Sequence, residues 1–171
     1  MKKRFITGVL IGLVSIITVV QVNGSRPKLV VGIVVDQLRT DYIESLESLF
    51  GEKGFKRLMK EGAYLRDVDF VVANPDAVNA TAMIYTGNYP SKNGVVASSI
   101  YNAEKHKSEA SLNDPASIGN FTTETYSPHN LMLSTISDEV KIDGAGLGAV
   151  YSITLDPQQA IIMAGHAGNS A

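Results

Sequence analysis

The chain has 171 residues, a net charge of −2 at pH 7 and no cysteine. Its charge balance excludes the strongly basic footprint of a nucleic-acid-binding domain, so no nucleic-acid partner is expected. Because this chain has no cysteine, its domain is not expected to use disulfides and must rely on its core or on bound metal. The length suits one small domain.

The first segment has the composition of a secretory signal peptide. Residues 1–4 are Met-Lys-Lys-Arg, residues 5–22 are almost wholly apolar, and small residues around Gly24 offer a cleavage site. This pattern predicts an exported bacterial protein, periplasmic or secreted, with a signal at 1–24 and a mature domain at 25–171. An uncleaved anchor is the alternative, because the apolar run is close to the length that spans a bilayer. No other membrane association is expected.

An apolar run that ends on a carboxylate follows the signal. Six of the eight residues at 28–35 are Leu, Val or Ile, which predicts a central parallel strand that is covered on both faces. Asp36 then lies at the carboxyl end of the strand, where α/β folds bind ligands, and its carboxylate suits a cation. The alternative is an acid that caps a turn or the next helix.

Helix and strand patterns alternate along the rest of the chain. A polar stretch at about 102–128 indicates a long surface excursion, which in a compact domain is usually functional or mobile. Strands that alternate with helices predict an α/β fold with a mostly parallel sheet. The predicted helices are residues 41–50, 55–61, 77–86 and 129–141, and the predicted strands are residues 28–36, 63–73, 146–153 and 160–163.

Four motifs occur in order along the chain. They are Val-Val-Asp-Gln-Leu-Arg at 34–39, Gly-Phe-Lys-Arg-Leu at 54–58, Tyr-Thr-Gly-Asn-Tyr-Pro at 85–90 and Ala-Gly-His at 164–166. Together they resemble the alkaline phosphatase superfamily, in the branch of the type I phosphodiesterase/nucleotide pyrophosphatases and the threonine-nucleophile alkaline phosphatases. The resemblance spans about residues 28–171. It implies a three-layer α/β/α fold that is incomplete in this chain.

The resemblance also implies a phosphoric ester hydrolase in which two zinc ions flank a hydroxyl nucleophile at the start of a helix. Its substrate would be a small phosphorylated molecule: a phosphate monoester, a phosphate diester or a nucleotide pyrophosphate. Asp36 would be a metal ligand, and the family's remaining ligands belong to its second half. His106, His129 and His166 do not form a ligand set. The 171 residues are therefore expected to be an N-terminal fragment that is inactive alone.

The nucleophile is the main departure from the family. The family's Thr or Ser lies ten residues before the Gly of the Tyr-Thr-Gly signature, and counting back from Gly87 gives Ala77, whose methyl group cannot attack phosphorus. Thr81 is a weak substitute, because a buried helical Thr usually bonds to its own backbone. Asp76 is a better candidate, as a metal ligand or an aspartyl nucleophile, although the role of helix N-cap is favoured for it.

Two further departures affect the groups that hold phosphoryl oxygens. The family's phosphate-binding Asn position falls near Ser98, a weak substrate-binding candidate, and a Lys-x-Arg pair of some relatives is replaced by Thr-Leu-Asp-Pro-Gln-Gln at 154–159. An enzyme for phosphate monoesters needs donors or positive charge on these oxygens. Two hypotheses follow: an exported, metal-dependent phosphoesterase, or a non-catalytic, degenerate superfamily member that binds a ligand or a partner.

Overall fold

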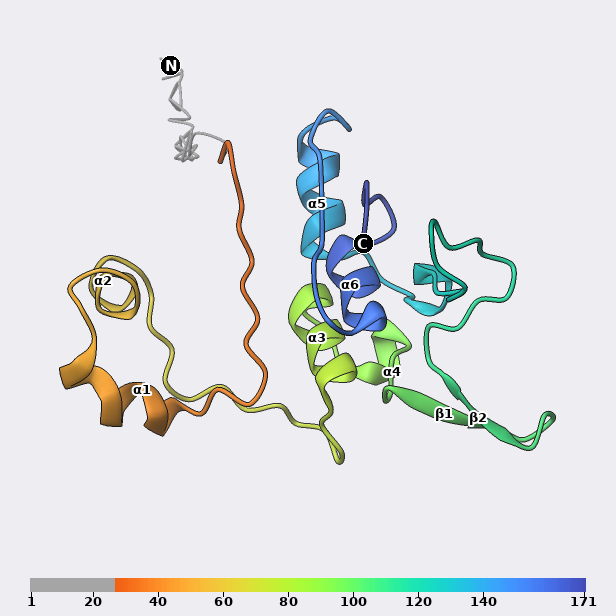
Figure 1. The fold of residues 1–171 in the computed structure, drawn as a ribbon, viewed down its shortest axis with the longest axis horizontal. Helices are drawn as coiled ribbons and strands as arrows, with labels where there is room; N and C mark the ends of the chain where they lie inside the picture. The colour runs from red at the N-terminus through yellow and green to blue at the C-terminus, as the bar shows by residue number, and fades with distance from the viewer. Residues whose placement is uncertain (1–26) are drawn as a thin grey trace, which may run out of the picture. The chain divides into compact units, whose positions relative to one another are not determined.

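The computed structural model describes residues 27–171, so the predicted signal peptide lies outside the described residues. The chain divides into two units, residues 1–33 and residues 34–171. All the described helices and strands belong to the second unit (Figure 1). In chain order they are α1 (Thr40–Leu46), η1 (Glu47–Leu49), α2 (Phe55–Glu61), α3 (Ala77–Thr86), α4 (Pro90–Asn93), β1 (Ser99–Asn102), β2 (Lys107–Ala110), η2 (Pro128–Asn130), α5 (Ile136–Asp143) and α6 (Pro157–Ala164).

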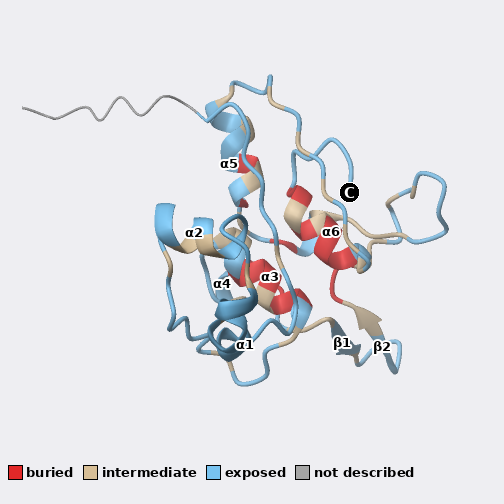
Figure 2. Ribbon diagram, turned by 60° about the vertical axis from the view of Figure 1, so that its left-hand side comes forward, coloured by how far each residue is buried: buried red, intermediate tan, exposed pale blue. Residues whose placement is uncertain are grey.

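The core of the second unit forms where α3 packs against α6. Most of the buried positions that Figure 2 colours red lie on these two helices. Tyr85, Tyr126 and Ile161 pack against the central cluster as partly buried side chains. The cluster itself is made by six fully buried apolar residues: Val78, Ala82, Val95, Leu112, Leu131 and Ile162.

Local signals define both core helices. Asp76 and Asn79 form a capping box at the start of α3, and Gly87 ends the helix in the left-handed conformation with φ 64°. Asp156 caps α6, whose first residue is Pro157, a position that tolerates the missing N–H of proline. These caps fix where the core helices begin.

A short antiparallel hairpin is formed by β1 and β2, with Ser99 opposite Ala110 and Asn102 opposite Lys107. The Asn102 side chain accepts hydrogen bonds from the backbone N–H groups of Glu104 and Lys105 and so stabilises the turn. Residues 107–110 belong to the polar stretch at 102–128, so part of that stretch is a strand.

Four predicted strands are absent from the described structure. Residues 28–36 and 63–73 have no regular structure, and within 146–153 only Tyr151 makes an isolated bridge, to Ser170. A parallel strand needs neighbouring strands for its hydrogen bonds, and in the described part β1 and β2 pair only with each other. Residues 160–163 are helical, because the Asp156 cap and Pro157 begin α6 ahead of them.

Helix 129–141 was also misplaced. Residues 128–130 form the 3₁₀ helix η2, and α5 begins at Ile136 because Thr135 and Asp138 form a capping box.

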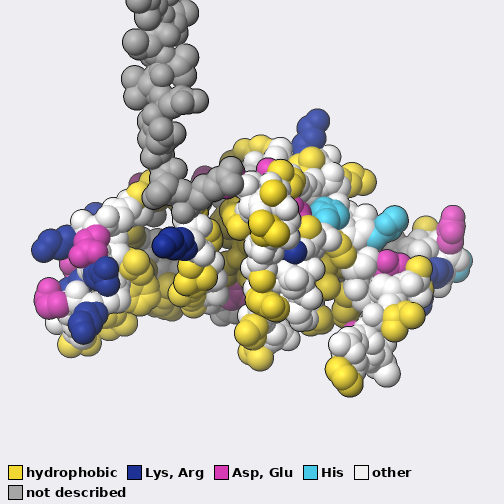
Figure 3. All heavy atoms as spheres, turned by 90° about the horizontal axis from the view of Figure 1, so that it is seen from above, with side chains coloured by type: hydrophobic (Ala, Val, Ile, Leu, Met, Phe, Trp, Pro, Cys, Tyr) yellow, Lys and Arg dark blue, Asp and Glu magenta, His cyan; other side chains and the backbone are white. Residues whose placement is uncertain are grey.

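Many apolar side chains are exposed, among them those of residues 29–35 and 65–71, which pair with no strand in the described structure. Hydrophobic side chains are spread over the face seen in Figure 3, and charged side chains gather at its left-hand end and occur at its right-hand end as well. In the described part, no helix is both long and apolar enough to cross a bilayer.

Candidate functional site

Asp76 occupies the start of α3 with both of its carboxylate oxygens bonded. Oδ1 accepts from the backbone N–H groups of Val78 at 3.0 Å and Asn79 at 2.8 Å, and Oδ2 accepts from the N–H of Ser98 at 2.6 Å. Carboxylates are favoured here because the N-terminal N–H groups of a helix are otherwise unpaired. Asp76 therefore caps α3 and joins it to the segment that precedes β1.

Ala77 is the first residue of α3 and its side chain is exposed. Its carbonyl oxygen accepts from the Thr81 hydroxyl at 2.7 Å and from Gln159 Nε2 at 3.2 Å. The Thr81 side chain is 1% exposed, and its oxygen also accepts from Gln159 Nε2 at 3.0 Å. The hydroxyl nearest to position 77 is thus buried and bonded on both sides.

Asp36 lies in a turn after the extended segment, and its side chain is exposed. The following residue, Gln37, has φ 60°, the left-handed conformation in which the chain turns away from the extended segment. Gln159 Nε2 lies 3.5 Å from Asp36 Oδ2. One amide group on α6 therefore connects Asp36 with the first turn of α3.

Ser98 and Gln158 complete this cluster. Gln158 Nε2 donates to the carbonyl oxygen of Ser98 at 3.0 Å, while Gln158 Oε1 accepts from the N–H of Leu112 at 3.1 Å. The three positions at which the sequence departs from the family that it resembles, namely 77, 98 and 154–159, therefore meet around the start of α3. Neutral amide side chains of α6 lie in the segment that replaces the Lys-x-Arg pair of some relatives.

The roles of Gln158 and Gln159 were missed from the sequence, where they counted only as the absence of cations. One signal was available: Asp156 followed by Pro157 is typical of a helix start, which would have placed both glutamines in a first helical turn. Their partners on α3 and before β1 could not be found this way, because they depend on how two helices pack.

The three histidines lie apart from this cluster. His166 contacts Asp138 through Nδ1 at 3.1 Å and the carbonyl oxygen of Leu131 through Nε2 at 2.8 Å. Burial would raise the pKa of Asp138, but hydrogen bonds from Thr135, His166 and Ala167 outweigh burial and lower this pKa below its usual value. This contact joins the start of α5 to the residues after α6.

Among the described residues, no group of three or more His, Cys, Asp or Glu side chains is placed to hold a metal ion. Asp36 offers the carboxylate chemistry that zinc accepts, but a zinc site needs three or four protein ligands. The described residues therefore supply one candidate ligand, Asp36, for such a site.

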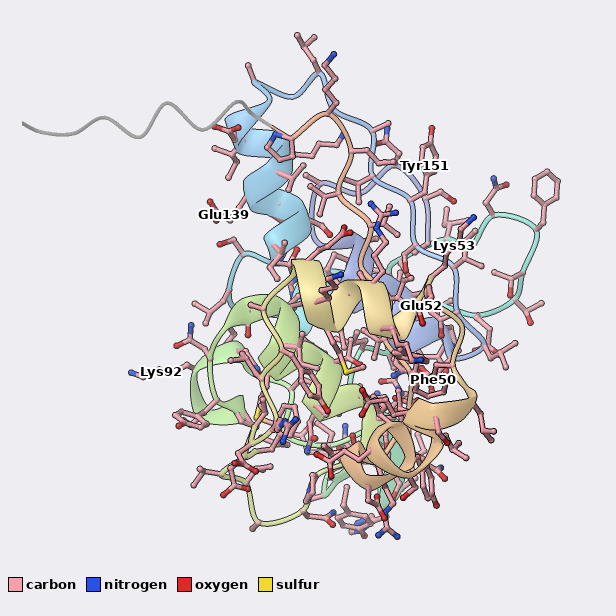
Figure 4. All side chains as sticks on the ribbon, turned by 90° about the vertical axis from the view of Figure 1, so that its left-hand side faces the viewer. Phe50, Glu52, Lys53, Lys92, Glu139 and Tyr151 are labelled. Carbon is pink, nitrogen blue, oxygen red and sulfur yellow. The ribbon has the colours of Figure 1, made fainter. Side chains whose placement is uncertain are left out.

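A depression of about 600 Å³ lies elsewhere, between α1 and α2. Side chains of both charge signs line it, among them Glu44, Lys56 and Arg66, and Glu52 and Lys53 lie on the turn that leads into α2 (Figure 4). The depression contains none of the candidate residues. Its charged lining does not indicate a function, because exposed ion pairs such as Lys56–Glu52 are common on solvated surfaces.

Comparisons with known proteins bear on this geometry. The family model described as Type I phosphodiesterase / nucleotide pyrophosphatase matches residues 30–153. The alkaline phosphatase PafA of Elizabethkingia meningoseptica is 35% identical over 146 residues, which are 82% of this chain and 27% of that protein. The alkaline phosphatase PhoV of Synechococcus elongatus is 31% identical over 150 residues, 86% of this chain and 27% of that protein.

A solved structure of one of these relatives is also similar to this chain. The crystal structure of wild-type alkaline phosphatase PafA superposes with a TM-score of 0.79 at 33% identity, covering 85% of this chain and 29% of that one. This likeness confirms the predicted fold class, an incomplete part of an alkaline phosphatase-like α/β fold. The chain spans about a quarter of the length of these relatives.

Proposed function

We propose, from the premise that this chain belongs to the type I phosphodiesterase/nucleotide pyrophosphatase family, that its residues form the N-terminal part of an exported, metal-dependent phosphoesterase. The share of its relatives that it covers, 27%, supports a longer protein. The proposed substrate is a phosphate monoester, a phosphate diester or a nucleotide pyrophosphate. Export is proposed on the charged and apolar pattern of residues 1–24.

The observation that carries this proposal is the position of Asp36. Its exposed carboxylate lies beside the start of α3, next to the position from which the family's nucleophile attacks. Asp36 would hold one of two zinc ions, with the other ligands supplied outside the described residues. Bound zinc would activate an attacking oxygen and polarise the phosphoryl group.

The side chains around the start of α3 limit which group can supply the attacking oxygen. Position 77 supplies no hydroxyl, Thr81 is buried and bonded, and the two oxygens of Asp76 accept three backbone N–H groups. We propose that Asp76 and Thr81 are structural, that Ser98 contributes only backbone groups, and that any attacking oxygen is a water molecule or comes from another part of the protein.

A second candidate is a non-catalytic superfamily member that binds a ligand or a partner. Ala77 favours it, together with the amides of Gln158 and Gln159 in the segment where some relatives carry a Lys-x-Arg pair. Without donors on the phosphoryl oxygens, a transition state with extra negative charge is poorly stabilised. The fold can persist without the activity, because function depends on the site rather than on the fold.

One experiment separates the candidates. The full-length protein is purified as wild type and as Asp36→Asn, and both forms are assayed for zinc content and for hydrolysis of p-nitrophenyl phosphate and bis-p-nitrophenyl phosphate. Turnover that Asp36→Asn abolishes supports the phosphoesterase. Zinc without turnover supports the non-catalytic member, and Ala77→Thr then tests whether the missing hydroxyl is the cause. Absence of both zinc and turnover would contradict the metal-dependent proposal.

A further inference from the structure

Gln159 has a side chain whose position is fixed by its surroundings. It lies in the first turn of α6, where its N–H bonds to the Asp156 cap at 3.1 Å, and it is 6% exposed. Its amide nitrogen reaches across to α3 and donates to Thr81 Oγ1 at 3.0 Å and to the carbonyl oxygen of Ala77 at 3.2 Å. Two helices therefore hold this amide in one orientation.

Asp36 has the opposite character. It belongs to a segment without helix or strand and is exposed. Its carboxylate lies 3.5 Å from Gln159 Nε2, which is the longest of the three contacts made by this nitrogen. Two N–H groups serve three acceptors here, so the contact with Asp36 shares a hydrogen and is the weakest of the three.

We propose that Gln159 is a positioning residue that holds the Asp36 carboxylate beside the start of α3. The inference rests on the proposed function, in which Asp36 is a metal ligand. A neutral amide suits this task, because it orients a carboxylate without cancelling the negative charge that a cation requires. Residues that hydrogen-bond a ligating carboxylate typically change metal affinity 10- to 100-fold when they are removed.

The chain offers a matched control for this inference. Gln158 is also 6% exposed, lies in the same turn of α6 and makes two buried hydrogen bonds, but to Ser98 and Leu112 instead of Asp36. Gln159→Met and Gln158→Met keep the length of the side chain and remove its polar atoms. A general loosening of α6 would affect both variants, whereas loss of positioning affects only the first.

Zinc affinity of the full-length protein is the first readout, measured by competition with a chromophoric chelator. We expect Gln159→Met to raise the dissociation constant about tenfold and Gln158→Met to leave it within about twofold. Equal effects of the two substitutions, or none for Gln159→Met, would overturn the inference. If Asp36→Asn leaves zinc binding unchanged, the proposed function has failed instead.

Backbone mobility of residues 34–39, measured as ¹⁵N order parameters, is the second readout, and it needs no metal. Gln159→Met and Asp36→Ala should each lower the order parameters of this segment, and the double variant should lower them no further than either. Gln158→Met should leave the segment unchanged. If Gln159→Met does not lower the order parameters there, Gln159 does not hold Asp36, whatever the zinc measurement gives.

Discussion

The α3–α6 core and the chain before it, residues 34–73, are both rich in apolar residues but differ in what becomes of them. In the core, Val78, Leu112 and Ile162 are fully buried. In the earlier region α1 and α2 contain no buried residue, and Leu65 in the segment that follows them is 76% exposed. Apolar composition thus indicates which residues can be buried, while burial itself depends on a partner element.

The helices of the two regions also differ in whether a side chain caps their first turn. Asp76 and Asp156 cap the core helices through side-chain hydrogen bonds. Arg39 and Gly54, at the starts of α1 and α2, provide no side-chain cap. The core region is therefore stabilised by capping side chains and by buried apolar packing. The earlier region has neither of these in α1 and α2, and its contacts are exposed ones such as the Arg57–Glu61 ion pair.

The largest expected effect tests this difference with one substitution made twice. In the 171-residue chain, Leu112→Ala should lower the free energy of unfolding by about 2–5 kcal/mol, because it leaves a cavity in the core. Leu65→Ala should change it by less than about 0.5 kcal/mol, because its side chain is exposed. Denaturant unfolding of both variants measures this. Equal losses would show that residues 63–73 are buried after all.

Local signals made part of the fold predictable. The predicted helices at 55–61 and 77–86 agree with α2 and α3, because glycines and the Asp76 cap mark their limits. The strand at 160–163 was wrong, because its run of apolar residues was given more weight than the helix start at Asp156 and Pro157. Residues 28–36 could not be judged locally, since a strand is defined by hydrogen bonds to other segments.

Part of the candidate site could also be predicted from the sequence. Family resemblance pointed to Asp36, Asp76, Ala77, Thr81 and Ser98, and the structure brings all five close to the start of α3. Whether they act as proposed stays a prediction. The contacts of Gln159 span 123, 82 and 78 residues along the chain, so no local pattern in the sequence could reveal them.

Acid pH is expected to weaken the contact between α5 and the residues after α6. The pKa of Asp138 is lowered in the folded protein, so its ionised form stabilises the fold above the unfolded pKa of about 3.9 and this contribution is lost as pH falls through the folded value. Thermal unfolding should therefore show a stability that declines below about pH 4.

Asp138→Asn supplies the control for this pH dependence. The variant cannot ionise at this position, so its thermal stability should be lower than that of the wild type at pH 7 and should fall less between pH 5 and pH 3. Hydrogen bonds to a charged group contribute about 1.5–3 kcal/mol, which sets the scale of the loss at pH 7. Parallel stability curves for the two proteins would show that other carboxylates account for the acid sensitivity.

The smallest expected effect concerns Asp76 and separates capping from charge. Asp76→Ala removes the acceptor of three backbone N–H groups and should lower the free energy of unfolding by about 1 kcal/mol. Asp76→Asn keeps an acceptor oxygen for the N–H groups of Val78 and Asn79 but none for the N–H of Ser98, so it should cost less than Asp76→Ala, because Asn and Asp are similar N-caps. Denaturant unfolding at pH 7 compares the two variants. If Asp76→Asn costs as much as Asp76→Ala, the cap contributes little, and the charged carboxylate with its contact to Ser98 accounts for the stabilisation by Asp76.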